Sequence, residues 1–422
     1  MRRIARIFKR AIKCIMHFIC KEKSTMKVKI KSICVGKGDC FFLCLEKEGK
    51  TFNIMVDCMK YNDKVKDFVE GTLNKHIDLL IVTHIDNDHV PGVTTMLNTE
   101  EDLEVEQIWF NCYQREPKTP AQKLTDYQKS RLLQLKRNIP IVADVLDSKA
   151  DVGDAQMLSE AILKYEAKIG KKVWKREYIT TDLHDIILGR NGEWGTIKFL
   201  SPTEEVIQAL DKDFRKMFRS LFYEKYENPL EEDVSIYELM MMYLNQKSES
   251  SETSVKTASA NSLSEQAFMN QANIEEEESR KENKASIAFI WSHGKHRVLF
   301  AGDASHEQLH SKLSAENSGN ENPLVFDAIK VSHHGSNTGT SKKLMSLIDS
   351  EEYFIPCGTS KVPSMPTMAK IIARPLQNGI SVRRIRYNKE TKNIRILHAN
   401  KSKYTNLPNF ELTDETEYEF TC

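Results

Sequence analysis

Apolar and polar positions alternate in two β-rich runs between residues 27 and 58, separated by a glycine-containing corner and by a Glu-Gly turn. This pattern is typical of neighbouring antiparallel strands. A helical stretch over 64–73 follows, and the continuously apolar run at 77–82 predicts a buried strand. Polar residues begin where that run ends. The first part of the chain therefore predicts a sheet with a polar loop at the end of a buried strand.

Strand and helix patterns continue on both sides of a long polar stretch. Before it, we expect strands at 106–112, 139–145 and 196–200 and helices at 125–138 and 155–168. After it, we expect strands at 286–291, 297–302, 381–387 and 393–398. Because sheet-forming sequence flanks the polar stretch, the order indicates an insertion into one domain rather than two domains in tandem.

The polar stretch itself has two parts. Residues 204–245 are helix-prone and amphipathic, whereas 246–284 are rich in serine and charge and offer almost nothing to bury. We therefore predict one domain made of 26–203 and 285–400. A helical and disordered insertion occupies 204–284, and 401–422 form a C-terminal tail.

The first 25 residues predict a basic amphipathic helix. Isoleucines and other apolar residues recur at helical spacing over 1–20, with arginine and lysine on the other face. Such a helix either contacts a membrane surface or a partner, or packs on its own domain. No run of about 18 apolar residues occurs, so we expect no transmembrane segment.

Composition narrows the class of protein. The 422 residues carry 61 Lys+Arg against 60 Asp+Glu, and 40% are hydrophobic. This balance excludes a uniformly basic nucleic-acid coat but leaves room for local basic patches. The nine cysteines are scattered without a CxxC pair, which favours reduced thiols and a cytoplasmic protein.

Histidine and aspartate concentrate in four short segments at predicted strand ends. A third of the 12 histidines lie in two of these segments. The candidate residues are Asp57, His84, Asp86, Asp88, His89, Asp303, His333 and His334. Loops beyond strand ends allow such side chains to converge on one point.

Imidazoles and carboxylates are the ligands of borderline and hard divalent cations, and a carboxylate such as Asp303 can bridge two ions. Two ions about 3.5–4 Å apart hold a hydroxide and stabilise an oxyanion or phosphoryl transition state. The pattern therefore predicts a metal-dependent hydrolase.

The motifs resemble those of the metallo-β-lactamase superfamily, and more closely the ComEC-type hydrolase domain of bacterial competence proteins. The loop HIDNDH at 84–89 is similar to the HxDxDH version of the superfamily's HxHxDH motif. VGKGD at 35–39, LSP at 200–202, Asn283 with Ser286, GD at 302–303 and HHGS at 333–336 match further motifs in the same order. The resemblance spans about 27–398 and implies an α/β fold of αββα type, in which helices flank two mixed β-sheets.

The resemblance also implies roles for single residues. It implies His84, Asp88, His89, Asp303 and one of His333 or His334 as ligands of two divalent ions, Zn²⁺ or Mn²⁺. Asp86 is a ligand or an orienting group, and Asp57 holds the His84 loop from behind. Asn283, Ser286, Ser336 and Asn337 are the implied contacts to substrate oxygens.

The chain departs from the family pattern at two places. Ser364 stands where many relatives have a histidine, and no separate third-motif histidine is found, since His184 is better interpreted as a turn residue. A phosphate contact or proton donor at position 364 is therefore in doubt.

The leading functional hypothesis is phosphodiester hydrolysis of DNA or RNA by a metal-bound hydroxide, with Asp86 or Asp303 holding or deprotonating the water and Asp88 completing the catalytic carboxylates. Eight positive charges oppose Glu390 over 381–403, among them Arg383, Arg384 and Arg386. They form either a strip that follows a phosphate backbone or an ordinary solvated hairpin. The alternatives are a small-molecule hydrolase and a partner-dependent module, for example in an anti-phage defence system, that docks through 204–284.

Overall fold

The computed structural model describes residues 25–111, 149–209, 263–320, 322–356, 362–377 and 379–422. The predicted N-terminal helix, the helix at 125–138, the strand at 139–145 and most of the helical part of the insertion lie outside the described residues. Among the described helices, none is long and apolar enough to cross a bilayer.

The first sheet contains six strands and is mixed. Its order is β18 (Glu417–Thr421), β1 (Lys27–Ser32), β2 (Phe41–Lys47), β3 (Lys50–Val56), β5 (Leu79–Val82) and β7 (Ile108–Phe110). The strands from β18 to β3 pair antiparallel, whereas β3, β5 and β7 run parallel to one another. The predicted strands in this part of the chain are confirmed.

The second sheet contains eight strands and is also mixed. Its order is β17 (Phe410–Thr413), β16 (Arg383–Tyr387), β15 (Glu352–Ile355), β13 (Ala328–Lys330), β11 (His296–Phe300), β10 (Ala288–His293), β9 (Thr196–Ser201) and β8 (Ile186–Ile187). The strands from β17 to β11 are parallel, and those from β11 to β8 are antiparallel. Two short pairs, β4 (His76–Ile77) with β6 (Glu104–Val105) and β12 (Leu324–Phe326) with β14 (Ile348–Ser350), complete the pairing.

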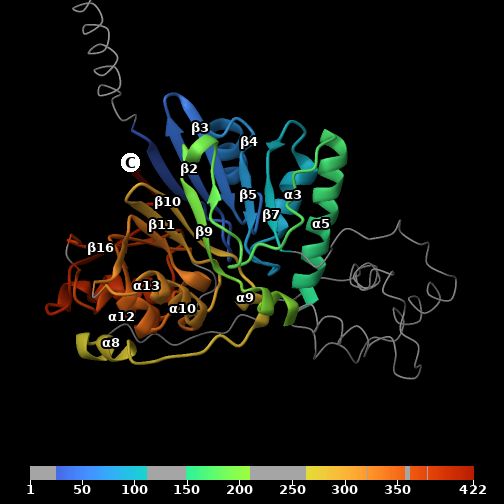
Figure 1. Ribbon diagram of the computed structural model, residues 1–422. Helices are drawn as coiled ribbons and strands as arrows, with labels where there is room; N and C mark the ends of the chain where they lie inside the picture. The colour runs from blue at the N-terminus through green and yellow to red at the C-terminus, as the bar shows by residue number, and fades with distance from the viewer. Residues whose placement is uncertain (1–24, 112–148, 210–262, 321, 357–361, 378) are drawn as a thin grey trace, which may run out of the picture.

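Helices cover the outer face of each sheet (Figure 1). The first sheet packs against α2 (Asp63–Asp67) with the π-turn Phe68–Thr72, α3 (Pro91–Thr99) and α5 (Lys149–Ile169). The second packs against α8 (Glu265–Gln271), α10 (His306–Glu316), α11 (Lys342–Leu347), α12 (Met365–Ile372) and α13 (Lys392–Asn400). The order of layers is helix, sheet, sheet, helix, which confirms the predicted αββα sandwich.

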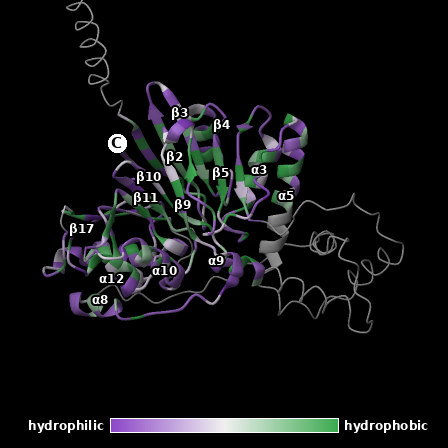
Figure 2. Ribbon diagram, in the orientation of Figure 1, coloured by the Kyte–Doolittle hydropathy of each residue, from purple (hydrophilic) through white to green (hydrophobic). Residues whose placement is uncertain are grey.

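Successive side chains of a strand point to opposite faces of its sheet, which produces three main apolar clusters among the described residues: one between the sheets and one under each helix layer. On β2, Phe42 joins the cluster under α3, whereas Phe41 points to the other sheet and meets Phe300 with ring centroids 6.1 Å apart. On β10, Ile290 faces the second helix layer and Trp291 faces the inter-sheet core. Hydrophobic residues accordingly concentrate on the strands in Figure 2. Burial on both faces fixes the register of the central strands.

The C-terminal residues correct two predictions. Residues 393–398 were expected as a strand but lie in α13, where Thr391 caps the helix and Ile394 and Leu397 are buried at a spacing of three. Residues 401–422, expected as a tail, contribute β17 and β18, one to each sheet. The acidic side chains of Glu417 and Glu419 pair with Lys29 of β1, so these charges are cross-strand partners.

The end of the predicted insertion is also part of the folded domain. Phe268 of α8 is buried and stacks on Tyr404 at 5.5 Å between ring centroids. Residues 273–280, which we call the strap, run from α8 to the short helix α9 (Lys281–Lys284). Glu275 of the strap accepts the backbone N–H of Lys342 and pairs with Lys370. The prediction that 246–284 bury almost nothing is therefore wrong for 263–284.

Candidate metal centre

The predicted histidines and aspartates meet at one edge of the two sheets. Asp57 follows β3 and the loop 83–89 follows β5; Asp303 follows β11, and the loop 331–336 follows β13. β3 pairs with β5 in parallel, and β11 pairs with β13 in parallel. The carboxyl ends of each pair therefore lie side by side. A hydrogen bond of 2.8 Å from the Ile287 N–H to the Thr83 carbonyl oxygen joins the two halves of the site.

Two glycines allow the loops to approach closely. A Cβ on Gly38 would lie 1.8 Å from the carbonyl oxygen of Asp88, so the corner before Asp39 tolerates no side chain there. Gly302 has a φ of 52°, and a Cβ on it would lie 2.5 Å from the Ser286 hydroxyl. These approaches account for the VGKGD and GD motifs in physical terms.

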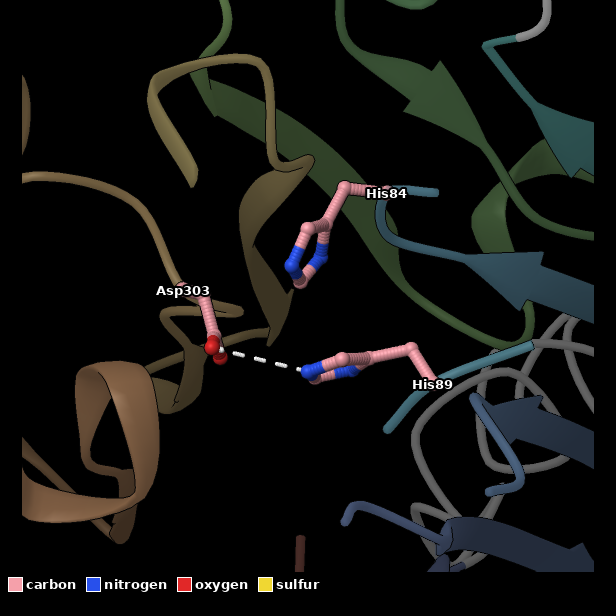
Figure 3. Close-up of side chains that lie close together, drawn as sticks. All are labelled: His84, His89 and Asp303. Carbon is pink, nitrogen blue, oxygen red and sulfur yellow. Dashed lines mark ion pairs between the residues drawn. The ribbon is translucent and has the colours of Figure 1, made fainter. Parts of the chain in front are cut away.

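Three buried side chains point toward one another at the centre of the site (Figure 3). They are His84, His89 and Asp303, and one ligand atom of each lies within 4.8 Å of those of the other two. A second group with the same property is Asp88, His89 and His334. His89 belongs to both groups. The structure therefore brings together six of the predicted ligand residues when Asp86 is counted beside His84, 3.6 Å from its Nε2.

Asp57 is hydrogen-bonded to His89 directly and to His84 through the Thr83 hydroxyl. Its Oδ2 accepts the His89 Nδ1–H at 2.8 Å and the Thr83 hydroxyl at 2.7 Å. Because the Thr83 hydroxyl donates to Asp57, it accepts from His84 Nδ1, 3.0 Å away. Each Nδ1 is thereby held as a donor, so that each Nε2 faces the centre and is the nitrogen that a metal ion would take in exchange for a proton.

The Nε2 atoms of His84 and His89 and Oδ1 of Asp86 are buried and have no hydrogen-bond partner among the described residues. Buried polar atoms are rarely left unpaired in a folded protein, and a cation held by His84, His89 and Asp303, whose ligand atoms lie within 4.8 Å of one another, would satisfy both imidazole nitrogens. Imidazole and carboxylate are also the donor types that divalent cations take. The residues present therefore fit a divalent metal ion.

A buried lysine balances part of the negative charge. Lys330 Nζ lies 2.5 Å from Asp39 Oδ2 and 3.4 Å from Asp303 Oδ1, and it donates to the Gly302 carbonyl oxygen. Burial opposes protonation of Lys330, but the two carboxylates outweigh it and raise the pKa of Lys330. Burial likewise opposes ionisation of Asp39, yet Lys330 and His334 lower the pKa of Asp39 to about 2.

The imidazoles also respond to the surrounding carboxylates. Burial opposes the charged form of His89, but Asp303, Asp57 and Asp88 raise its pKa well above the usual value. The pKa of His334 rises to about 10, against the effect of burial, through Asp39 and Asp303. A metal ion at this centre therefore competes with protons for these nitrogens.

The structure distinguishes the two adjacent histidines. His334 is buried, and its Nε2 lies 3.0 Å from Asp88 Oδ2 in the second ligand group. His333 is 24% exposed, and its Nδ1 lies 3.1 Å from Glu278 Oε2 of the strap. His333 Nε2 stays 4.0 Å from Asp303 Oδ2. The geometry favours His334 as the ligand and places His333 at the mouth of the site.

The side chains expected to contact substrate also form hydrogen bonds within the protein. The Ser286 hydroxyl is buried and accepts the Asp303 N–H at 2.9 Å, so it positions a candidate ligand. The Asn283 amide is buried and donates to Glu278, and Asn337 accepts from Lys370. Ser336 is half-buried and contacts the Thr338 hydroxyl.

The three arginines expected to bind substrate are committed to internal ion pairs. Arg383 is fully buried and bonds Asp349 through two nitrogens. Arg384 and Arg386 both pair with the buried Glu352. These ion pairs favour the alternative to a phosphate-binding strip at the three positions: Glu352 lies on the neighbouring parallel strand β15, and Asp349 lies on β14.

Sequence reasoning missed five residues of the site: Asp39, Thr83, Glu278, Arg280 and Lys330. Asp39 is the last residue of the VGKGD motif and Thr83 directly precedes the HIDNDH loop, but their contacts depend on the folded loops. A lysine within the apolar run at 328–331 was a signal for Lys330, since an unpaired buried lysine is costly. The two strap residues lie in the polar stretch, where the sequence offers no comparable signal.

No family model matches this chain, and no curated protein matches it. Among solved structures, it is similar to the metallo-beta-lactamase fold protein YhfI from Bacillus subtilis, with a TM-score of 0.31 and 9% identity over 94% of this chain and 99% of that chain. It is also similar to CmlA, a diiron beta-hydroxylase from Streptomyces venezuelae, with a TM-score of 0.35 and 10% identity over 93% of this chain and 54% of that chain. Likeness at this level says nothing of activity, metal or substrate.

Proposed function

We propose that this protein is a metal-dependent hydrolase of the metallo-β-lactamase superfamily, and that it cleaves phosphodiesters. One observation carries the proposal: His84, His89 and Asp303 converge from both sheets, and the buried Nε2 atoms of the two histidines face carboxylates without a hydrogen-bond partner among the described residues. The order of motifs along the chain supports the superfamily, and the HxDxDH loop supports the ComEC-type subgroup.

The proposed ligands divide into two overlapping groups. His84, His89 and Asp303 would hold one divalent ion, with Asp86 beside His84, and Asp88 and His334 would hold a second together with His89, which belongs to both groups. Divalent ions there supply activated water and neutralise charge that develops on the phosphoryl oxygens. Zn²⁺ and Mn²⁺ both suit this mixture of imidazole and carboxylate.

The protein's own residues supply orientation. Asp57 and Thr83 fix the ring planes of His84 and His89, and Ser286 fixes the backbone of Asp303. Lys330 holds Asp39 and Asp303 from beneath the site, so the carboxylates remain in place when the centre is empty of substrate. Preorganised groups of this kind need little rearrangement in the transition state.

The substrate is the less constrained part of the proposal. A phosphodiester of DNA or RNA remains our first candidate, because of the ComEC-type motifs. The internal pairing of Arg383, Arg384 and Arg386 favours a second candidate, a small phosphodiester, since these arginines cannot follow a long phosphate backbone.

The test is a hydrolysis panel with the full chain. Purified protein with Mn²⁺ or Zn²⁺ is incubated with single- and double-stranded DNA and RNA and with bis(4-nitrophenyl) phosphate. We expect cleavage of at least one phosphodiester, and loss of it in Asp88→Ala but not in His184→Ala, whose side chain is exposed. Failure on every phosphodiester contradicts the proposal and favours the partner-dependent module. Cleavage of the small diester alone removes nucleic acid as the substrate.

A further inference from the structure

Arg280, at the end of the strap, reaches the edge of the candidate metal centre. Its Nη2 lies 2.8 Å from Oδ2 of Asp86, whose side chain is only 5% exposed. The Arg280 side chain is 44% exposed. Arg280 Nε also lies 3.9 Å from Glu282 Oε2, so the guanidinium contacts a candidate ligand through Nη2 and a second carboxylate through Nε, while nearly half of the side chain is exposed to solvent.

The position of Arg280 is set by a buried carboxylate. Glu278 Oε1 accepts the Arg280 backbone N–H at 2.8 Å. Glu278 Oε2 accepts the Asn283 amide at 2.9 Å and the Thr338 hydroxyl at 2.9 Å. Burial opposes ionisation of Glu278, but its hydrogen bonds with His333, Asn283 and the Arg280 N–H lower the pKa of Glu278 to about 2. The strap is thus tied to the HHGS loop directly before Arg280.

The charges around the site give Arg280 its role. The described contacts of the site include five aspartates, at positions 39, 57, 86, 88 and 303, and the cationic side chains of Lys330 and Arg280. Lys330 is 3% exposed and lies beneath Asp39 and Asp303, so an incoming anion cannot reach it. Arg280 is the accessible cation among these described contacts.

We propose that Arg280 binds the anionic oxygen of the substrate beside Asp86 and thereby selects anionic phosphodiesters over neutral esters. This inference rests on the proposed function and adds a specificity-determining residue to it. A guanidinium presents planar N–H donors that match phosphate oxygens, and it keeps its charge at any physiological pH. Strap and HHGS loop together place this donor over the side of the centre that contains His84 and Asp86.

The experiment separates anion binding from hydrolysis. Calorimetry measures the binding of inorganic phosphate to the Mn²⁺-loaded full chain, to Arg280→Gln, to Arg280→Lys and to the exposed control Arg190→Gln. Kinetics of the same proteins compare bis(4-nitrophenyl) phosphate, a monoanion, with diethyl 4-nitrophenyl phosphate, which is neutral and has the same leaving group. Metal content is quantified in every variant.

We expect Arg280→Gln to weaken phosphate binding about tenfold or more, with metal content unchanged, since a charge-assisted hydrogen bond is lost. Arg280→Lys should recover part of the affinity, and Arg190→Gln should match the original protein. Where hydrolysis is seen, KM should rise for the diester and not for the neutral triester.

Two results overturn the inference: phosphate binding that is absent in the original protein, or binding that Arg280→Gln leaves unchanged. If diesters are cleaved while the affinity for phosphate does not change in Arg280→Gln, the proposed function stands and this inference fails. If phosphate binding depends on Arg280 but no phosphodiester is cleaved, the anion site stands and the proposed function fails.

Discussion

At the scale of single residues, one carboxylate organises the candidate ligands. The Asp57 carboxylate accepts a hydrogen bond from His89 Nδ1–H and another from the Thr83 hydroxyl, which in turn contacts His84 Nδ1. Partners behind metal-binding histidines determine which nitrogen carries the proton and how the ring is held. The hydroxyl of Thr83 should therefore affect metal binding although it contacts no ion itself.

We predict that Thr83→Val weakens the affinity for Mn²⁺ or Zn²⁺ about tenfold or more, because His84 loses the acceptor for its Nδ1–H. Thr83→Ser keeps the hydroxyl and should stay close to the original affinity. Calorimetric titration of each protein with the metal checks this. Equal affinities in the valine and serine variants would mean that the hydroxyl has no orienting role.

A second residue-scale prediction concerns Asp349, far from the ligands in sequence. Its pKa is lowered from the usual 3.8, since hydrogen bonding to Arg383 and the charge of Arg374 outweigh the effect of burial. A lowered pKa in the folded state stabilises the protein above pH 3.8, and this stabilisation is lost as the pH falls further.

Asp349→Asn should consequently lower the free energy of unfolding by about 3 kcal/mol at pH 6, because the buried Arg383 loses its charged partner. The difference from the original protein should narrow as the pH falls below 3.8, because the Asp349 carboxyl of the unfolded chain takes up a proton before that of the folded protein does. Urea unfolding at several pH values measures it. A difference that grows toward acid pH would reverse the assigned sign.

At the scale of elements, local patterns predicted most strands and the loops that carry the chemistry. A buried apolar run ending in HIDNDH was sufficient to place His84 and His89, because strand ends in a sheet face one edge. The pattern failed at α13, since Ile394 and Ile396 alternate like a strand while the buried pair is Ile394 and Leu397. The sequence is compatible with both a strand and a helix here, and tertiary packing selects the helix.

The strap illustrates what local patterns cannot supply. Glu278 and Arg280 lie in a run of charged residues that looks like a solvated linker, and their roles depend on Thr338 and Asp86 from distant loops. The same holds for Arg383, which looks like a basic surface residue until Asp349 is placed beside it. Composition and periodicity cannot predict which charged residues pair when they are distant in sequence.

At the scale of the whole molecule, the C-terminal strands β17 and β18 each form one edge of a sheet. β17 extends the second sheet beside β16, and β18 covers the edge of the first sheet along β1. An uncovered edge strand offers unpaired backbone groups to other chains. The C-terminal strands therefore protect the core that holds the four site loops in register.

We expect deletion of residues 415–422 to lower the urea midpoint of unfolding markedly and to promote aggregation, because β1 becomes an exposed edge. Glu419→Gln is the matched control, since it removes one ion pair at the surface while keeping the strand and should cost less than about 1 kcal/mol. An unfolding midpoint unchanged by the deletion would show that β18 is dispensable.

Residues from both sheets form the proposed divalent metal site, so the amount of metal bound by purified protein is the decisive measurement. The full chain, His89→Ala and the control His184→Ala are dialysed against Mn²⁺ or Zn²⁺ and their bound metal is measured. We expect at least one bound ion per chain in the original protein and in His184→Ala, and loss of bound metal in His89→Ala. Original protein that binds no metal, or His89→Ala that binds as much as the original, would contradict the proposed site.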